Sequence, residues 1–122
     1  MKGTLVPVVL LPRYTGYLWA DTFTTVPLNV EAYARGTITL WRGRMPGTTP
    51  TFKAYFEDSH DAVTWTPFNA SGEDPGAAAA MIVRFELARR WLRVKVVLTG
   101  TGTGVSCWAA GFLEERVDGP GR

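Results

Sequence analysis

The stretch MIVRFELARRWLRVKVVL, residues 81–98, decides the fold class of this 122-residue chain. In both halves of it, apolar side chains alternate with other residues, and the halves meet at Arg89-Arg90. A period of two residues is that of a strand with one buried face, whereas a helix would repeat about every 3.6 residues. The lack of Gly and Pro from Ala77 to Leu98 also permits a helix, but strict alternation and abundant Val favour two strands.

The same pattern extends to both sides of this stretch. Gly36 to Arg42 reads GTITLWR, which places Ile38 and Leu40 on one face and Trp41 on the other. After a flexible Gly-Thr segment at residues 100–104, which we expect to form a hairpin loop, Val105 to Leu113 predicts the closing strand.

Five further segments have the composition of strands bounded by turn residues. They are Gly3–Leu11, Tyr17–Ala20, Phe23–Leu28, Thr51–Glu57 and Val63–Phe68, of which the last two are expected to form a hairpin. A mobile loop is expected at residues 43–50, and a loop with one possible helical turn at 70–80. The sequence therefore predicts an all-β protein, an antiparallel β-sandwich or jelly-roll-like domain of about seven to nine strands.

One domain is expected from this length. We predict an N-terminal strand or docking arm at residues 1–13, the β-sandwich at 14–116 and a flexible tail at 117–122. Pro7 and Pro12 confine the first segment to a sheet edge or to an arm. No apolar run approaches the roughly 20 residues that cross a bilayer, so no membrane role is expected.

Charge and composition exclude several classes of function. Charged residues make up 20% of the chain and the net charge is only +2, so a broad field for nucleic acid is not expected. A local basic cluster is formed by Arg84, Arg89, Arg90, Arg93 and Lys95. It could face an acidic partner or nucleic acid, but we interpret it as a solvated face.

Catalytic, cofactor and metal sites are not expected. Cys107 is the only cysteine and the only histidine lies far from it in sequence, so a buried, inert thiol is predicted. That histidine, His60, is flanked by Glu57, Asp58 and Asp61. Such a cluster could bind Ca²⁺, but it lacks the Gly and the regular ligand spacing of a calcium loop, and turn chemistry explains it better.

The tryptophans are numerous for this length, five in 122 residues. Trp41 and Trp91 are out of phase with the aliphatic faces of their strands and are the best candidates for exposure. They could form a protein interface, which we favour, or stack on sugar rings, which would require both to lie side by side on a flat face. The predicted interface residues are Trp41 and Trp91, Leu5 and Val8 of the N-terminal segment, and Arg90 and Arg93.

Three sequence features give the chain a resemblance to a known class of protein. They are Thr48-Thr49-Pro50-Thr51, the acidic Glu57-Asp58-Ser59 before Thr64-Trp65-Thr66, and Arg89-Arg90-Trp91-Leu92-Arg93-Val94 before the Gly-Thr loop. In this order they resemble small structural proteins of tailed bacteriophages and related particles, over the middle and C-terminal two-thirds of the chain.

The resemblance implies a non-enzymatic subunit of a virion, assembled in the host cytoplasm, that decorates a capsid or joins head or tail parts. Its partners would be other virion or capsid proteins and further copies of itself, as a homo-oligomer or lattice subunit. The alternative is a carbohydrate-binding β-sandwich module. No cofactor is expected for either function.

Overall fold

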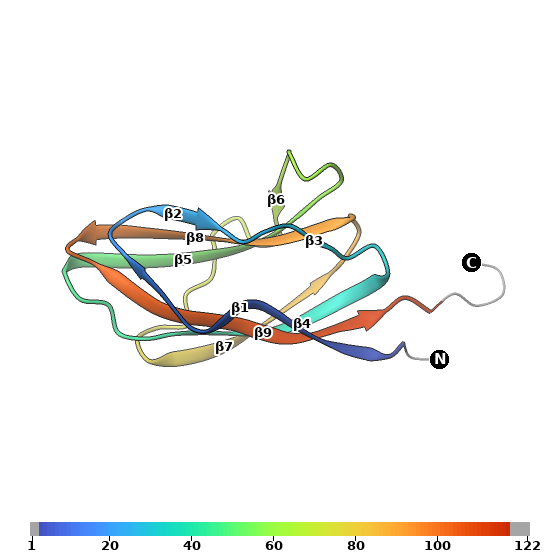
Figure 1. Cartoon of the computed structure of the whole chain (residues 1–122), viewed down its shortest axis with the longest axis horizontal. Helices are drawn as coiled ribbons and strands as arrows, with labels where there is room; N and C mark the ends of the chain where they lie inside the picture. Colours follow the sequence, from blue (N-terminus) through green and yellow to red (C-terminus); the bar gives the residue numbers. More distant parts are fainter. Residues whose placement is uncertain (1–2, 118–122) are drawn as a thin grey trace.

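The computed structural model describes residues 3–117, and within them every regular element is a β-strand. Two layers of strands pack face to face (Figure 1). The strands are β1 (Leu5–Leu18), β2 (Thr22–Thr24), β3 (Leu28–Asn29), β4 (Tyr33–Arg42), β5 (Thr48–Ser59), β6 (Thr66–Pro67), β7 (Ala79–Glu86), β8 (Trp91–Thr101) and β9 (Gly104–Glu115). The predicted all-β sandwich is confirmed.

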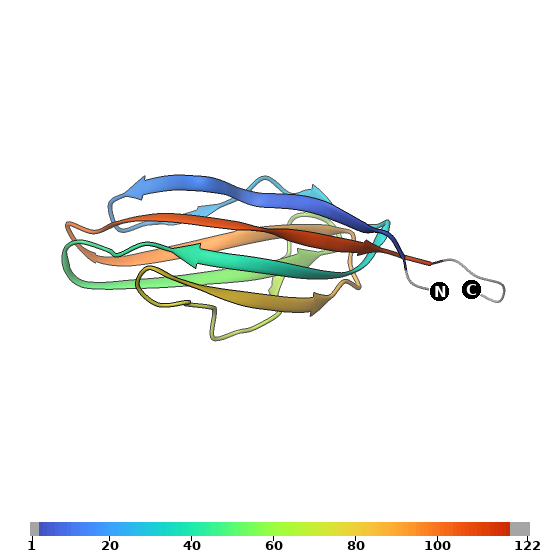
Figure 2. The same ribbon diagram turned by 90° about the horizontal axis from the view of Figure 1, so that it is seen from below.

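The strand order is that of a jelly roll. Sheet A has the order β1-β9-β4-β7, as Figure 2 shows, and sheet B has the order β2-β8-β5-β6 with β3 also paired to β8. With β2 and β3 taken as one interrupted strand, the first strand pairs with the last, the second with the last but one, and so on inward to β5 and β6. That nested, antiparallel pairing is the pattern of a jelly roll.

Alternation within the strands builds the core between the sheets. In β8, Leu92, Val94, Val96 and Leu98 are all buried, as are Phe52, Ala54 and Phe56 of β5. In sheet A each strand likewise buries every second side chain, and these include Ile38, Leu40, Val83, Phe85 and Leu113. The predicted inward faces of β4 and β7 are confirmed.

Phe85 shows why one inward position of β4 is a glycine. Its ring lies over Gly36, where a Cβ atom would come within 2.5 Å of Cε1 of the ring. The ring also stacks on Phe68, with centroids 4.7 Å apart, and lies 5.9 Å from the ring of Phe56. The aromatic cluster thus joins the two sheets at the β7 side of the sandwich.

The N-terminal segment is one long strand rather than two pieces. Residues 5–18 pair with β9 along their whole length, with register shifts between Val9 and Leu11 and between Leu11 and Thr15. The N–H of Glu115 donates to the carbonyl of Thr4, so by alternation the odd-numbered residues of this part of β1 direct their N–H groups away from β9. Pro7 occupies such a position, which explains why proline interrupts no hydrogen bond there.

Several local predictions need correction. The two strands predicted on either side of Arg89-Arg90 are confirmed, and they belong to different sheets, β7 to sheet A and β8 to sheet B. The Gly-Thr segment likewise connects β8 to β9 across the two sheets rather than closing a hairpin. In a jelly roll these links cross between the layers, because each strand finds its partners far away in sequence.

Other boundaries also differ from the prediction. β5 begins at Thr48, inside the segment predicted as a mobile loop, while only Thr66–Pro67 of the predicted strand 63–68 pairs with β5. The alanine run forms a turn and the start of β7 rather than a helical turn. Of the predicted tail, residues 118–122 lie outside the described residues. The described part contains no helix that could span a membrane.

Two isoleucines on opposite faces of sheet A test this architecture. Ile38 is fully buried and Ile82 is 54% exposed. Truncation of Ile38 to alanine leaves a cavity, so Ile38→Ala should lower the free energy of unfolding by about 2–5 kcal/mol. Ile82→Ala is the matched control and should lower it by less than about 1 kcal/mol. Urea unfolding followed by circular dichroism measures both, and equal losses would contradict the assignment of faces.

Candidate protein interface

The outward face of sheet A carries apolar side chains in rows that cross all four strands. The register places Val9, Ala110, Thr39 and Ile82 in one row, and Pro7, Phe112, Thr37 and Arg84 in the next. Leu5, Val9, Ile82 and Phe112 are large hydrophobic residues that stay between 48% and 61% exposed. Soluble proteins seldom expose large apolar side chains in one contiguous group unless the group binds something.

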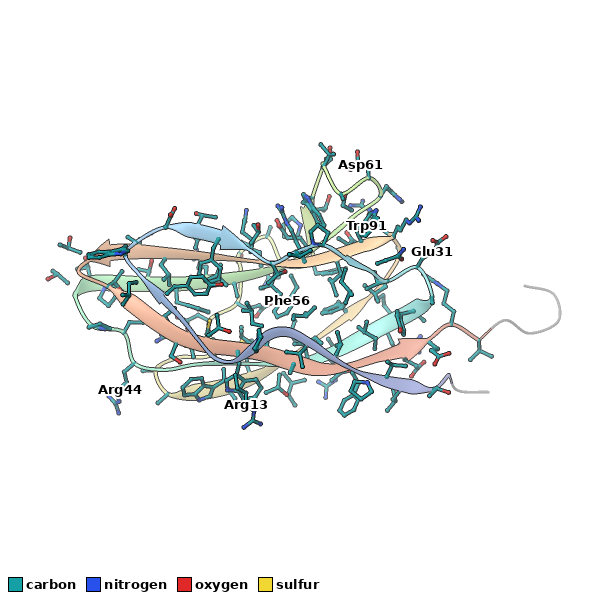
Figure 3. All side chains as sticks on the ribbon, in the orientation of Figure 1. Arg13, Glu31, Arg44, Phe56, Asp61 and Trp91 are labelled. Carbon is teal, nitrogen blue, oxygen red and sulfur yellow. The ribbon has the colours of Figure 1, made fainter. Side chains whose placement is uncertain are left out.

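A tryptophan pair extends the apolar rows toward the other end of the face. Trp41 and Trp108 are direct cross-strand partners on β4 and β9, and both are half-buried. The guanidinium carbon of Arg13 lies 4.8 Å from the centre of the Trp108 ring, a cation–π contact. Figure 3 shows Arg13 on this side of the molecule. Arg13 comes from the irregular part of β1, where the register shifts bring it over its neighbour strand.

A charged row closes the opposite end of the face. Arg35 of β4 lies between two carboxylates, with its Nη1 bonded to Glu114 and its Nε 3.3 Å from Oε1 of Glu86. The two carboxylates raise the pKa of Arg35 further above its ordinary value, chiefly through the hydrogen bond to Glu86. Glu86 is 76% exposed, so this row forms a polar rim rather than a buried network.

Two shallow hollows lie along this rim. One of about 280 Å³ is lined by residues of β4 and β7, including Arg84 and Glu86. The other, of about 200 Å³, is lined by Leu5, Phe112 and Glu114 together with residues of β4. Both are lined by Arg35 and Thr37, so they are adjacent. They can receive side chains of a partner beside the apolar rows.

The predicted interface residues are divided between three locations. Leu5 and Trp41 lie on the outward face of sheet A, whereas Val8 points inward and packs against the core. Trp91 and Arg93 lie on the outward face of sheet B, with Arg90 in the turn just before them. Trp41 and Trp91 therefore do not lie side by side, which removes the flat aromatic pair that the sugar-binding alternative required.

Three exposed residues of the sheet A face, Val9, Ile82 and Phe112, were not predicted from the sequence. Phe112 is out of phase with the buried Cys107, Ala109 and Leu113 of its own strand. Ile82 similarly lies between inward-facing residues of β7. An apolar side chain at a position where alternation predicts a polar one was the signal that could have identified them.

On the outward face of sheet B, the basic side chains are engaged within the protein. The carboxylate of Glu57 is almost fully buried and accepts a 2.9 Å hydrogen bond from Nε of Arg93, with Nζ of Lys95 3.7 Å away. The Arg93 guanidinium in turn lies 4.2 Å from the centre of the Trp65 ring. Arg93 and Lys95 thus neutralise a buried carboxylate, so their charges stabilise the fold and are not free for a partner.

The other members of the predicted basic cluster do not form one face with them. Arg89 bonds to Asp58 at 3.3 Å, and Arg90 lies 3.5 Å from Glu31 and over the ring of Trp91. Arg84 lies on sheet A, and within the described residues its guanidinium forms no ion pair. Arg84 is therefore the basic residue of the cluster that is available to a partner.

The segment around His60 is a capped turn that projects beyond sheet B (Figures 1 and 3). One carboxylate oxygen of Asp61 accepts hydrogen bonds from the N–H groups of Val63 and Thr64, both at 2.9 Å. Ser59 also donates to that oxygen. These bonds lower the pKa of Asp61 from 3.8 to about 2. Within the described residues no group of acidic, histidine and cysteine side chains is placed to hold a metal ion.

The pKa of Asp61 gives a prediction for acid pH. Because its folded-state pKa is depressed, ionised Asp61 stabilises the turn at neutral pH, and this stabilisation is lost as pH falls from about 4 through about 2. Carbon-detected NMR titration should give Asp61 an apparent pKa near 2. Asp58 is the internal control, because burial raises its pKa above 3.8 despite the nearby Arg89. Titration of Asp61 at or above the pKa of Asp58 would contradict the capped turn.

Cys107 is fully buried in β9, as predicted, and burial raises the pKa of its thiol to about 11. At pH 8 only roughly one thiol in a thousand would be ionised. We therefore expect reaction with a disulfide reagent to be far slower in the native protein than in denaturant. Absorbance of the released thiolate measures both rates, and similar rates would show that the thiol is accessible.

A further apolar groove of about 500 Å³ runs between the sheets at the β1 edge. It is lined by Leu10, Leu11 and Pro12 on one side and by Val26, Pro27 and Leu28 on the other. The register shift of β1 and the break between β2 and β3 leave the sandwich incompletely closed there.

Comparisons with protein-family models, with curated proteins and with solved structures give no match for this chain.

Proposed function

We propose that the chain is a non-enzymatic structural subunit of a phage-like particle, and that it binds neighbouring virion proteins through the outward face of sheet A. The observation that carries this proposal is the set of exposed apolar residues on one face of sheet A, in adjacent rows, namely Leu5, Val9, Ile82 and Phe112. A sheet face of this kind can pack on a second flat surface without forming a deep pocket.

The size of the face suits repeated, modest contacts. β4 has ten residues, so at about 3.3 Å per residue and about 4.8 Å between strands the four-stranded face measures roughly 33 by 19 Å. That is roughly 600 Å², below the 800 Å² or so that each partner contributes to a stable standard interface. One such contact would be weak, but a symmetric lattice repeats it and gains avidity.

The architecture is consistent with this proposal. Jelly rolls are used by viral capsid proteins, and also by lectins and other binding proteins, so the fold alone does not decide the function. The order of sequence segments that resembles small phage structural proteins adds to the case. Carbohydrate binding is the alternative, but Trp41 and Trp108 are half-buried and Arg13 covers the ring of Trp108, so they offer little platform for a sugar.

Binding to particles tests the proposal. Labelled protein should sediment with particles banded from a lysate of the source, and Phe112→Glu should weaken that binding at least tenfold, because a charge would be buried at the centre of the contact. Val63→Glu is the matched control, since Val63 is 79% exposed but lies in the turn that projects beyond sheet B. Its binding should equal that of the unmodified protein.

Two results would overturn the proposal. One is a protein that does not sediment with particles, above all if it binds a glycan array instead. The other is unchanged particle binding by Phe112→Glu when urea unfolding shows that the variant is folded.

A further inference from the structure

The edge of sheet A that β7 forms differs from the other sheet edges of the sandwich (Figure 2). An edge strand exposes main-chain N–H and C=O groups that can pair with another strand, so proteins usually block such edges with proline, bulges or very short strands. Each of the other edges of the described structure carries one of these features.

The β1 edge contains Pro7 and Pro12 and two shifts of register. On sheet B, β2 and β3 have three and two residues and are separated by a segment that contains Pro27. The opposite edge of that sheet has only the two residues of β6, and beyond them the isolated bridge of Glu73 to Ala54 occupies β5.

β7, in contrast, is eight residues long, and neither proline nor a bulge interrupts its pairing with β4. The N–H of Leu87 donates to the carbonyl of Ala34 at 2.8 Å, which identifies the odd-numbered residues as those bonded to β4. The main-chain groups of Ala80, Ile82, Arg84 and Glu86 therefore point outward from the edge, away from β4, and no other strand of the described residues pairs with them.

The charges on this edge favour one partner. In an antiparallel pair, residues directly opposite each other come within about 5.5 Å, so opposite charges attract and like charges repel. Arg84 has no ion pair of its own within residues 3–117, and Oε2 of Glu86 is not engaged by Arg35. Arg84 and Glu86 can therefore both form ion pairs with a strand that presents the same two charges in reverse order.

We propose that two copies of this chain pair antiparallel through β7, about a two-fold axis at Phe85. In this register Arg84 of each copy lies opposite Glu86 of the other, and each pair can exchange two main-chain hydrogen bonds. A shift of two residues, to the next of the free positions, would place Arg84 opposite Arg84, or Glu86 opposite Glu86. The charge pattern thus favours this register over the two neighbouring ones.

Such a dimer is closed, because both copies use the same part of the edge, Arg84 to Glu86, about one two-fold axis. It joins two copies of sheet A into one continuous sheet and places the two outward faces next to each other. The pairing uses the edge of the sheet rather than its face. It therefore stands or fails independently of particle binding.

Light scattering and hydrogen exchange of the full chain, without particles, test the pairing. From micromolar to millimolar concentration the mass should rise toward twice the 13.4 kDa of one chain. The amide hydrogens of Arg84 and Glu86 should become protected in step with it, which a dimer formed through the sheet face would not produce.

Charge reversal tests the register. Arg84→Glu and Glu86→Arg should each raise the dissociation constant of the dimer at least tenfold, because each variant places like charges opposite each other. The double variant Arg84→Glu/Glu86→Arg should restore dimerisation, since the two charges are again complementary. This rescue excludes misfolding as the cause of the single-variant defects.

A protein that stays monomeric throughout, a double variant that is not rescued, or amide protection elsewhere than on β7 would overturn the proposal. A strand from another protein would then be the candidate for this edge.

Discussion

The pairing of the first long strand with the last is the interaction on which the rest of the structure depends. β1 follows β9 from Leu5 to Leu18, and β9 in turn follows β4 along nearly its whole length. The β1–β9 contacts join residues about a hundred positions apart, so they form only when the intervening chain has folded back on itself. Once they exist, the alternation within each strand determines which residues enter the core and which form the outward faces.

Local alternation was the part of the fold that the sequence could predict. It located most of the strands and the buried faces of β4, β5 and β8, as Ile38, Phe56 and Val94 illustrate. Partners could not be predicted in the same way, because a hairpin and a link between two sheets need the same turn residues. The Arg89-Arg90 turn and the Gly-Thr segment both join strands that belong to different sheets. The position of Pro7 on the free edge of sheet A also depends on the pairing of β1 with β9, which the sequence of β1 does not reveal.

The candidate interface was only partly predictable for the same reason. Phase within β4 was enough to place Trp41 on an outward face, and phase within β8 was enough for Trp91. Whether Trp41 and Trp91 lie on the same face depends on which sheet each strand joins. β4 belongs to sheet A and β8 to sheet B, so the two residues lie on opposite sides of the molecule. Val8 shows a different difficulty. The start of β1 is an almost continuous apolar run, so the sequence does not show whether its odd or its even residues are buried. The register with β9 decides this.

The β1–β9 pairing also fixes how the domain would respond to mechanical load. Leu5 lies opposite Glu114, so the two strands that lead to the chain ends leave the sandwich side by side at one end. A force that pulls these ends apart acts along the inter-strand hydrogen bonds and breaks them one after another, like a zipper. A force applied along the strands would instead load many of these bonds at once. The sandwich is therefore mechanically soft when Leu5 and Glu114 are pulled apart, and stiffer when the load runs along the strands.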